Sequence, residues 1–266
     1  MKNKIESTII ITAENQERFI ERCIKSCLNQ SVKNIEIIII FTKLKNINTL
    51  KRRYLSKNIV FLSIPKKINK PTQDQLFKIK QGLLISRGKY IFLLDGDDTY
   101  KKNKVKEAIN SIKDKKVLFL DNYENNKNDI KQINKVHGFK ETNLYKTLIN
   151  AWPKGVCTSC IVLNRELLNE FFKKIKIKKF NYLAIDILLT IYCDIKYMVI
   201  KSTKTLTKKY YVKNSVDSSY VGFFNKYYWF RRSEQHDFYT YINKSTKLNL
   251  DFIVTKIINF LLKVLN

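Results

Sequence analysis

The chain has 266 residues, of which 44% are hydrophobic and 12% aromatic, and it contains only 6 Gly and 3 Pro. This length and composition fit one medium-sized globular domain with an appendage, large enough to bury a core. The charge is one-sided, with 51 Lys and Arg against 23 Asp and Glu and a formal net charge of +28. Such an excess favours anionic partners, namely nucleotide phosphates, lipid head groups, acidic glycans or nucleic acid, although lysines scattered along a whole chain also arise from compositional bias.

The cysteines argue against a disulfide framework and against zinc. Their number is odd and the sequence shows no signal peptide, which indicates a reduced, cytoplasmic protein. Cys157-Thr-Ser-Cys160 has the spacing of half a zinc site, but no second Cys/His pair follows, and His137 and His236 stand alone. No stretch approaches the ~20 uncharged apolar residues that a membrane-spanning helix needs. The five cysteines are Cys23, Cys27, Cys157, Cys160 and Cys193.

Strands and helices alternate along the first half of the chain. Apolar runs predict strands at residues 8–12, 35–41, 58–64, 90–94 and 117–120. Helical spacing of apolar residues predicts helices at 16–28, 72–86 and 103–113, with Gly88 as the C-cap of the second. The hydrophobicity of residues 35–41 is continuous rather than alternating, which is typical of strands buried on both faces. The pattern therefore predicts a doubly wound α/β sheet, mostly parallel and flanked by helices.

The second half continues this pattern and then changes character. We predict a loop at 124–134, a strand at 156–163, helices at 165–174 and 182–193, and a strand at 197–200. No linker rich in Gly, Pro or Ser divides the chain, so we expect one folded unit over residues 1–215. Residues 216–266 form a distinct tail, with an aromatic and basic segment at 220–232 followed by an amphipathic helix.

Three carboxylates follow directly on the apolar run at 90–94, in the tetrad Asp95-Gly96-Asp97-Asp98. Carboxylates this close repel one another, and gathering them is costly unless a hard cation such as Mg²⁺ or Mn²⁺ supplies the counter-charge. In an open α/β sheet, ligands bind at the carboxyl ends of the strands. The tetrad therefore predicts a site for a divalent cation and a phosphate, and the alternative is a surface turn, for which Asp and Gly are also suited.

Two segments of the chain resemble the family 2 glycosyltransferases, enzymes of the GT-A fold that move a sugar from a nucleotide donor. The first is Ser7-Thr-Ile-Ile-Ile-Thr-Ala-Glu-Asn15, with the helix that follows it and ends in Leu-Asn-Gln30. The second, more specific segment is Gly82-Leu-Leu-Ile-Ser-Arg-Gly-Lys-Tyr-Ile-Phe-Leu-Leu-Asp-Gly-Asp-Asp98, which is similar to the family's helix, turn, strand and Asp-Xaa-Asp motif. A looser similarity extends to about residue 215.

The resemblance implies a nucleotide-sugar donor and a cation, Mn²⁺ or Mg²⁺, that bridges the Asp-Xaa-Asp site and the donor phosphates. It implies Asp97 as the direct metal ligand, Asp95 as a contact of the donor ribose or of a metal-bound water and so part of the metal site, and Asp98 as a supporting neighbour. The donor-binding residues that it implies are Thr12, Ala13, Asn15, Lys78, Lys80 and Asp95.

A general base is also needed, because an acceptor hydroxyl must lose its proton as it attacks the anomeric carbon. The family places an Asp at the start of a late helix, and the matching stretch here is Tyr182-Leu-Ala-Ile-Asp-Ile-Leu-Leu-Thr190, which implies Asp186 as the catalytic base. Flanking isoleucines favour partial burial and a raised pKa. The alternative is that Asp186 is an ordinary helix N-cap.

The chain departs from the family pattern on the donor side, so the resemblance does not identify the nucleotide base. Glu14 stands where the family often has Tyr, and Ile79 replaces a common Arg, although Lys78 and Lys80 flank it. The turn after the second strand reads Phe41-Thr-Lys-Leu rather than an Asp-rich sequence, and Val212 stands where the family has a His. A lysine would replace the arginine only as a point charge.

Together these observations predict an inverting, metal-dependent glycosyltransferase that adds a sugar to a bacterial cell-surface glycan, such as lipooligosaccharide, capsule or a lipid-linked oligosaccharide. Two alternatives stay open. Loss of donor-side residues favours a catalytically silent glycosyltransferase-like subunit that binds a glycan or a partner. The net charge and the aromatic-basic segment favour nucleic-acid binding, but no recognisable nucleic-acid motif accompanies them, and we expect no specific nucleic acid.

The tail helix carries an apolar stripe that must be covered. Packing on the protein's own core or on a sister subunit is one outcome. The aromatic residues at 227–230, with Arg231 and Arg232, favour the other, a peripheral position on the anionic inner face of the cell membrane. The oligomeric state is not predicted. The stripe consists of Leu250, Ile253, Val254, Ile257, Ile258, Leu261, Leu262 and Leu265.

Overall fold

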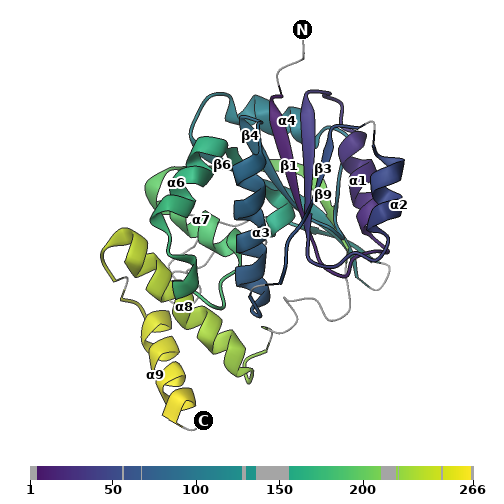
Figure 1. The fold of residues 1–266 in the computed structure, drawn as a ribbon. Coiled ribbons are helices and arrows are strands. Elements are labelled where there is room, and N and C mark those ends of the chain that lie inside the picture. Colours follow the sequence, from purple (N-terminus) through teal and green to yellow (C-terminus); the bar gives the residue numbers. More distant parts are fainter. Residues whose placement is uncertain are drawn as a thin grey trace.

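In the computed structural model, one mixed sheet is covered by helices on both faces (Figure 1). The structure describes residues 5–55, 57–66, 68–127, 130–135, 156–210, 220, 222–246 and 248–264. The strands are β1 (Ser7–Ala13), β2 (Ile35–Phe41), β3 (Ile59–Ser63), β4 (Tyr90–Asp95), β5 (Thr99–Tyr100), β6 (Val117–Lys127), β7 (Ile130–Asn134), β8 (Ile161–Asn164) and β9 (Met198–Lys209). The helices are α1 (Ile20–Leu28), α2 (Ile47–Arg53), α3 (Pro71–Ile85), α4 (Lys104–Ile112), α6 (Arg165–Lys174), α7 (Ile185–Lys196), α8 (Lys226–Asn243) and α9 (Leu250–Val264), with 3₁₀ turns η2 (Thr158–Cys160) and η3 (Ile177–Lys179).

The sheet is parallel in its first half and mixed in its second. The strand order is β3-β2-β1-β4-β8-β6-β9-β5, with β7 paired to β6 alone. Strands β3, β2, β1 and β4 are parallel neighbours, as predicted from their continuous hydrophobicity. Strand β8 is antiparallel to both β4 and β6, whereas β9 is parallel to β6. The register sets Thr12 of β1 beside Asp95 of β4, so the ends of these two strands meet.

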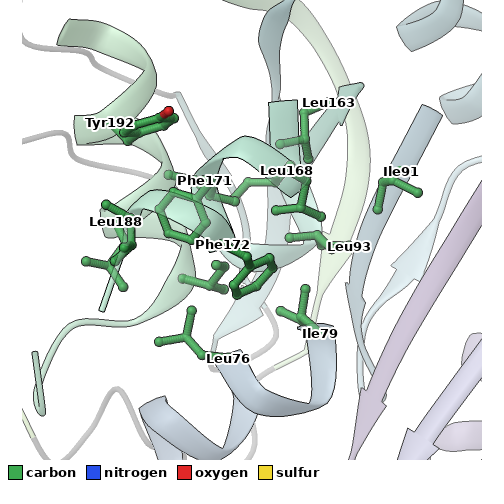
Figure 2. Close-up of a cluster of buried hydrophobic side chains, with 14 of the residues drawn as sticks. Leu76, Ile79, Ile91, Leu93, Leu163, Leu168, Phe171, Phe172, Leu188 and Tyr192 are labelled. Carbon is green, nitrogen blue, oxygen red and sulfur yellow. The ribbon is translucent and has the colours of Figure 1, made fainter. Parts of the chain in front are cut away.

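Two apolar layers hold the helices onto the sheet. Residues Ile38 and Ile40 of β2 pack into the layer under α3, α6, α7 and α8, while their neighbours Ile37 and Ile39 pack into the layer under α1, α2 and α4. Successive residues of a strand point to opposite faces, so a strand covered on both sides is apolar throughout. Figure 2 shows part of the first layer, in which Phe171 and Phe172 of α6 lie among side chains of α3, α7 and the sheet.

The Gly88 C-cap prediction is wrong. Helix α3 ends at Ile85, and its cap residue is Ser86, whose φ of −72° is not left-handed. Gly88 is needed for close approach instead, because a Cβ there would lie 2.4 Å from the backbone of Ser7 and of Thr8. The glycine therefore lets the segment entering β4 pass directly beside the start of β1.

The predicted loop at 124–134 is also wrong. Strand β6 runs on to Lys127, and β7 pairs with it antiparallel from Tyr123↔Asn134 to Lys127↔Ile130. Residues 128 and 129 lie outside the described part of the chain. The Lys- and Asn-rich composition resembles that of a loop, but a strand ladder is made by backbone groups and does not require apolar side chains. The predicted strand at 156–163 is shorter than expected, because η2 precedes β8.

The tail forms two helices, α8 and α9, that pack against each other (Figure 1). Of the two outcomes considered for the apolar stripe of α9, packing on the protein's own core does not occur in the structure, since the buried residues of α9 are Asp251, Thr255 and Asn259. Residues 211–219 lie outside the described residues, and with them the domain boundary at 215 and Val212. Among the helices that the structure describes, none combines the length and the hydropathy needed to span a bilayer.

Candidate active site

A hydrogen bond from Gly96, in the turn after β4, links the ends of β1 and β4. The Gly96 N–H donates to the carbonyl of Thr12 over 2.9 Å. A Cβ at Gly96 would lie 2.4 Å from Oε1 of Gln16 and 3.0 Å from Cβ of Ala13, so a larger residue would push the two strand ends apart. The Thr12 hydroxyl donates to Asp95 over 3.4 Å. Thr12 and Ala13, predicted as donor-binding residues, therefore lie directly beside the carboxylates.

Asn15 shapes the segment that leaves β1. It has a left-handed backbone (φ 54°), a conformation that Asn adopts more readily than most residues. Its N–H donates to the carbonyl of Lys43 over 3.1 Å, and its side chain is exposed. The structure thus places Asn15 at the rim of the β1 end, beside the segment that follows β2.

Asp95 and Asp98 are held by side chains from distant parts of the chain. Gln75 of α3 donates to Oδ1 of Asp95 over 2.7 Å. The hydroxyl of Ser159, in η2, donates to Oδ2 of Asp98 over 2.6 Å and accepts from the N–H of Asp95 over 3.1 Å. The other oxygen of Asp98 accepts from the N–H of Tyr210 over 3.0 Å. Both oxygens of Asp98 are therefore engaged in fixing the turn, as expected of a supporting neighbour.

Burial raises the pKa of all three carboxyls, and repulsion from neighbouring carboxylates raises that of Asp95 and Asp98 further. Burial raises the pKa of Asp95 well above its ordinary value, and the charges of Asp98 and Asp97 raise it further. For Asp98, burial and the charge of Asp97 raise the pKa to about 7. Burial also raises the pKa of Asp97. The nearby cation Lys209 opposes these shifts without cancelling them.

A divalent cation fits this cluster, because it would supply the missing positive charge. Asp95 and Asp97 are the carboxylates suited to hold it, since Asp98 has both oxygens engaged. No group of three His, Cys, Asp or Glu side chains forms a ready-made metal site within the described residues. That agrees with Mg²⁺-type binding, in which one or two carboxylates hold the ion and substrate phosphates complete its shell.

Asp186 lies in the first turn of α7 and faces the same edge. The N-cap of α7 is Ala184, so the interpretation of Asp186 as the N-cap is wrong. Its carboxylate accepts from the N–H of Ile187 over 2.7 Å, and the side chain is half-buried. Behind burial and the neighbouring aspartates, the charge of Asp186 also raises the pKa of Asp95, which shows that the two carboxylates lie within electrostatic reach.

The two lysines predicted for the donor phosphates have different positions. Lys78 is buried, and its Nζ lies 2.6 Å from Asp74 and 3.4 Å from Glu14 at the end of β1. Lys80 is half-buried and lies two residues further along α3. Residues two apart on a helix do not share a face, so the structure brings Lys78, and not Lys80, to the end of β1.

Sequence reasoning missed Gln75, Ser159 and Arg22. The Arg22 guanidinium donates to the carbonyl of Asp97 over 3.0 Å and stacks on the ring of Tyr210, 3.4 Å from its centroid. A signal for Ser159 was present, because it lies between the cysteines taken as half a zinc site. Gln75 and Arg22 carried no signal, since their partners are distant in sequence.

Two contacts hold η2 in place beneath the carboxylates. The buried ammonium of Lys104 donates to the Cys160 carbonyl over 3.3 Å, and the hydroxyl of Thr207 donates to the Ser159 carbonyl over 3.2 Å. Lys104 also pairs with Asp121. Residues of α4 and β9 therefore fix the position of η2 and, with it, of the Ser159 hydroxyl.

A cavity of about 590 Å³ lies away from these carboxylates, between η3, the segment before α7, and the tail. Its walls include Tyr182, Phe230 and Glu234, but none of the three aspartates at the end of β4. The cavity is therefore separate from the carboxylate edge.

Residues 77–175 match the model of the family described as Glycosyl transferase family 2. This segment contains most of α3, the Asp-Gly-Asp-Asp turn and Ser159. No curated protein matches the chain by sequence.

Solved glycosyltransferase structures share the fold. S. aureus TarS 1–349 in complex with UDP-GlcNAc has a TM-score of 0.63 and 15% identity, over 96% of this chain and 70% of that one. Full TarS has a TM-score of 0.61 and 14% identity, over 92% of this chain and 41% of that one. The mannosyltransferase PcManGT from Pyrobaculum calidifontis, in complex with GDP-Man and Mn²⁺, has a TM-score of 0.59 and 12% identity, over 98% and 70%. The family model thus matches a central segment of the chain, and the likeness to these solved structures shows that the chain has the GT-A fold.

Proposed function

We propose that the chain is an inverting, metal-dependent glycosyltransferase that moves a sugar from a nucleotide-diphosphate donor to a hydroxyl of a bacterial cell-surface glycan. The observation that carries the proposal is the buried cluster of Asp95, Asp97 and Asp98 at the end of β4, with Asp186 of α7 near enough for its charge to raise the pKa of Asp95. Transfer with inversion needs both a site for the leaving diphosphate and a base for the acceptor. In this proposal, the carboxylates at the end of β4 supply the site for the diphosphate, and Asp186 of α7 supplies the base.

Asp97 and Asp95 would hold the divalent cation. When bound, Mn²⁺ or Mg²⁺ supplies Lewis-acid stabilisation of the departing nucleoside diphosphate. Gln75 and Thr12 orient Asp95 by hydrogen bonds, and Ser159 holds the backbone N–H of Asp95. This support keeps the carboxylate from rotating away, so that little reorganisation accompanies catalysis.

Asp186 would act as the base. Its carboxylate removes the proton from the acceptor hydroxyl while the hydroxyl oxygen forms a bond to the anomeric carbon. The bond from that carbon to the diphosphate oxygen breaks, and the electron pair leaves with the diphosphate. The N–H of Ile187 donates to one oxygen of Asp186 and so helps to fix the orientation of its carboxylate.

The donor is proposed only as a class. TarS is solved with UDP-GlcNAc and PcManGT with GDP-Man, so related folds take different bases and sugars. In this chain Glu14 is paired with Lys66 and Lys78 at the end of β1. Thr12, Ala13, Asn15 and Lys78 are the residues proposed to contact the donor. Lys80 is proposed as a further donor contact, although it is two residues from Lys78 on α3 and so does not share its face.

A panel of nucleotide-sugars tests the proposal. With Mn²⁺ present, the cognate donor raises the melting temperature of the chain, since a ligand that binds only the folded state stabilises it by mass action. The same donor is then tested for release of nucleoside diphosphate with and without glycan acceptors. Donor binding without any turnover would favour the silent subunit, and binding of polynucleotides in preference to every nucleotide-sugar would favour a nucleic-acid-binding protein.

A further inference from the structure

Helix α9 turns its apolar face away from the protein. Most of the large exposed hydrophobic side chains in the described residues belong to the tail, and Phe260 and Ile257 of α9 are 66% and 54% exposed. In Figure 1, α8 and α9 extend from the lower side of the molecule, where α3 begins. The exposed apolar residues of α9 are Leu250, Ile253, Val254, Ile257, Phe260, Leu261 and Val264.

The opposite face of α9 is polar and is fixed to α8. Asp251 is 7% exposed, and its carboxylate accepts from Nε of Arg232 over 2.7 Å and lies 3.0 Å from Nε2 of His236. Thr255 and Asn259 lie one helical turn apart and are buried on the same face of α9 as Asp251. The side-chain amide of Asn259 donates to the hydroxyl of Ser233 over 3.2 Å. Rotating α9 to bury its apolar stripe would break these contacts and leave charged groups of α8 buried without their partner.

The net charge of the chain favours an anionic bilayer over a second copy of the chain as the occupant of the apolar face of α9. A second copy of the chain would bring another net charge of +28 to the interface, and the like charges would repel. An anionic bilayer attracts the same charge, because each Lys or Arg near its surface gains about 1 kcal/mol. The only acidic residue of α9, Asp251, is buried against α8, so the outward face presents no carboxylate to lipid phosphates.

We propose that the outward face of α9 is a lipid-binding surface that inserts into the interface of an anionic bilayer, with its polar face kept on α8. The residues that enter the bilayer are Ile253, Ile257, Phe260, Leu261 and Val264. An amphipathic helix lying in the interface buries its apolar face among the head groups and acyl chains. The proposal rests on the proposed function only in giving the enzyme access to an acceptor at a membrane.

The tail also connects this surface to the catalytic edge. Glu234 of α8 accepts hydrogen bonds from the N–H groups of Asn181 and Tyr182, over 2.8 and 2.7 Å. These residues lead directly into α7, whose first turn carries Asp186. Docking of α9 on a bilayer would therefore hold the base at a defined height above the lipid surface.

Co-sedimentation with lipid vesicles tests the proposal on the full chain. The double variant Ile257→Glu/Phe260→Glu places two carboxylates on the outward face, three residues apart. The control is Leu55→Glu, which introduces one carboxylate at a residue that is 85% exposed and lies just after α2. Helix α2 covers the face of the sheet opposite to the one that α8 packs against (Figure 1). Vesicles contain phosphatidylglycerol or phosphatidylcholine alone.

The wild-type chain and the Leu55→Glu control are expected to sediment with phosphatidylglycerol vesicles and to bind phosphatidylcholine much more weakly. The double variant is expected to lose at least about tenfold in partitioning, since two large apolar side chains no longer enter the apolar phase. Equal sedimentation of the double variant and the control would overturn the proposal.

A second copy as the true occupant would also overturn it. Light scattering would then show a dimer for the wild type and the control, and a monomer for the double variant. The proposed function is tested separately, because Mn²⁺-dependent binding of a nucleotide-sugar in the absence of vesicles is expected to be the same in all three proteins. Failure of the wild-type chain to bind lipid, with intact donor binding, would therefore refute this inference alone.

Discussion

Buried carboxylates at two places in this protein have opposite electrostatic surroundings. At the α8–α9 contact, burial raises the pKa of Asp251, but the hydrogen bond from His236 and the charge of Arg232 outweigh it and hold the pKa below its usual range. At the end of β4, burial and neighbouring carboxylates raise the pKa of Asp95 and of Asp98, and the charge of Lys209 offsets these shifts only in part. The first carboxylate is therefore a structural contact that is complete in the folded chain.

The carboxylates at the end of β4 lack full charge compensation unless a ligand supplies positive charge. Buried charges are normally paired, and functional sites are where proteins retain unpaired ones. The comparison teaches that burial of an aspartate does not by itself indicate catalysis. What separates the two groups is whether the chain supplies the counter-charge or leaves it to a ligand.

The largest effect is expected from Asp97→Asn. The substitution keeps the size of the side chain but removes a charged metal ligand, so sugar transfer should fall by about 10³, the upper scale for losing one electrostatic stabiliser of a leaving group. The measurement is the rate of nucleoside diphosphate release with saturating Mn²⁺. Asp114→Asn, at an exposed aspartate, is the control and should retain the wild-type rate. Transfer at a near wild-type rate by Asp97→Asn would rule out its role as a metal ligand.

Asp186→Asn sharpens the comparison at the acceptor side. Turnover should fall by at least about 10², because general-base help is lost while the metal site is kept. Donor affinity, measured by thermal shift with Mn²⁺, should be unchanged. The control is Asp194→Asn, a half-buried aspartate two turns further along α7. A parallel loss of donor affinity would instead assign Asp186 a structural role in the first turn of the helix.

Ser159→Ala tests whether the carboxylates need outside support. Its hydroxyl holds both Asp98 and the backbone of Asp95, so its loss should weaken Mn²⁺ binding and turnover by about tenfold, the lower scale for removing a partner of a metal ligand. Ser111→Ala, which removes an exposed hydroxyl on α4, should change neither. A loss of turnover with unchanged Mn²⁺ affinity would contradict the positioning role of Ser159.

The structural carboxylate should behave in the opposite way. Asp251→Asn is expected to lower the free energy of unfolding by about 2 kcal/mol, because Arg232 and His236 lose a buried anionic partner, with no change in solution turnover. Asp237→Asn removes an ion pair with Lys256 that is half exposed to solvent, and should cost less than about 1 kcal/mol. Urea denaturation measures both. Equal effects of the two substitutions would show that Asp251 contributes no more than a surface pair.

The pH dependence of stability follows from the lowered pKa of Asp251. Its folded pKa lies below the unfolded value of about 3.9, so its contribution is complete above that pH and is lost as the pH falls through the folded pKa. The difference in stability between wild type and Asp251→Asn should therefore be constant above about pH 5 and should shrink in more acidic solution. A difference that grows on acidification would contradict the ion-pair account.

Strands and helices of the first half were predictable because their local patterns coincide with their final burial. The continuous apolar run of Ile35–Phe41 is buried on both sides of the sheet, and β2 has the predicted bounds. Strand β7 was missed because its stability comes from pairing with β6 rather than from apolar side chains. Helix α9 was predicted from its period, but the period does not say which face is covered, and the polar face is the covered one.

Some residues of the candidate site could likewise be predicted from the sequence, and others could not. Asp95 and Asp97 were found because they are adjacent in sequence and follow a buried strand. Ser159 and Gln75 reach the carboxylates from other elements, 64 and 20 positions away in sequence, and such contacts exist only after folding. Local sequence therefore identified the groups that carry the charge, and the structure was needed to find those that position them.

Binding of Mn²⁺ is the most direct test of the central claim, which is that the carboxylates at the end of β4 bind a divalent cation together with a diphosphate. Free Mn²⁺ can be followed by electron paramagnetic resonance while wild type and Asp97→Asn are titrated with the nucleoside diphosphate of the cognate donor. The wild type is expected to remove Mn²⁺ from solution in proportion to enzyme when the diphosphate is present, and Asp97→Asn to remove far less. Equal uptake by both proteins, or none by the wild type, would contradict the claim.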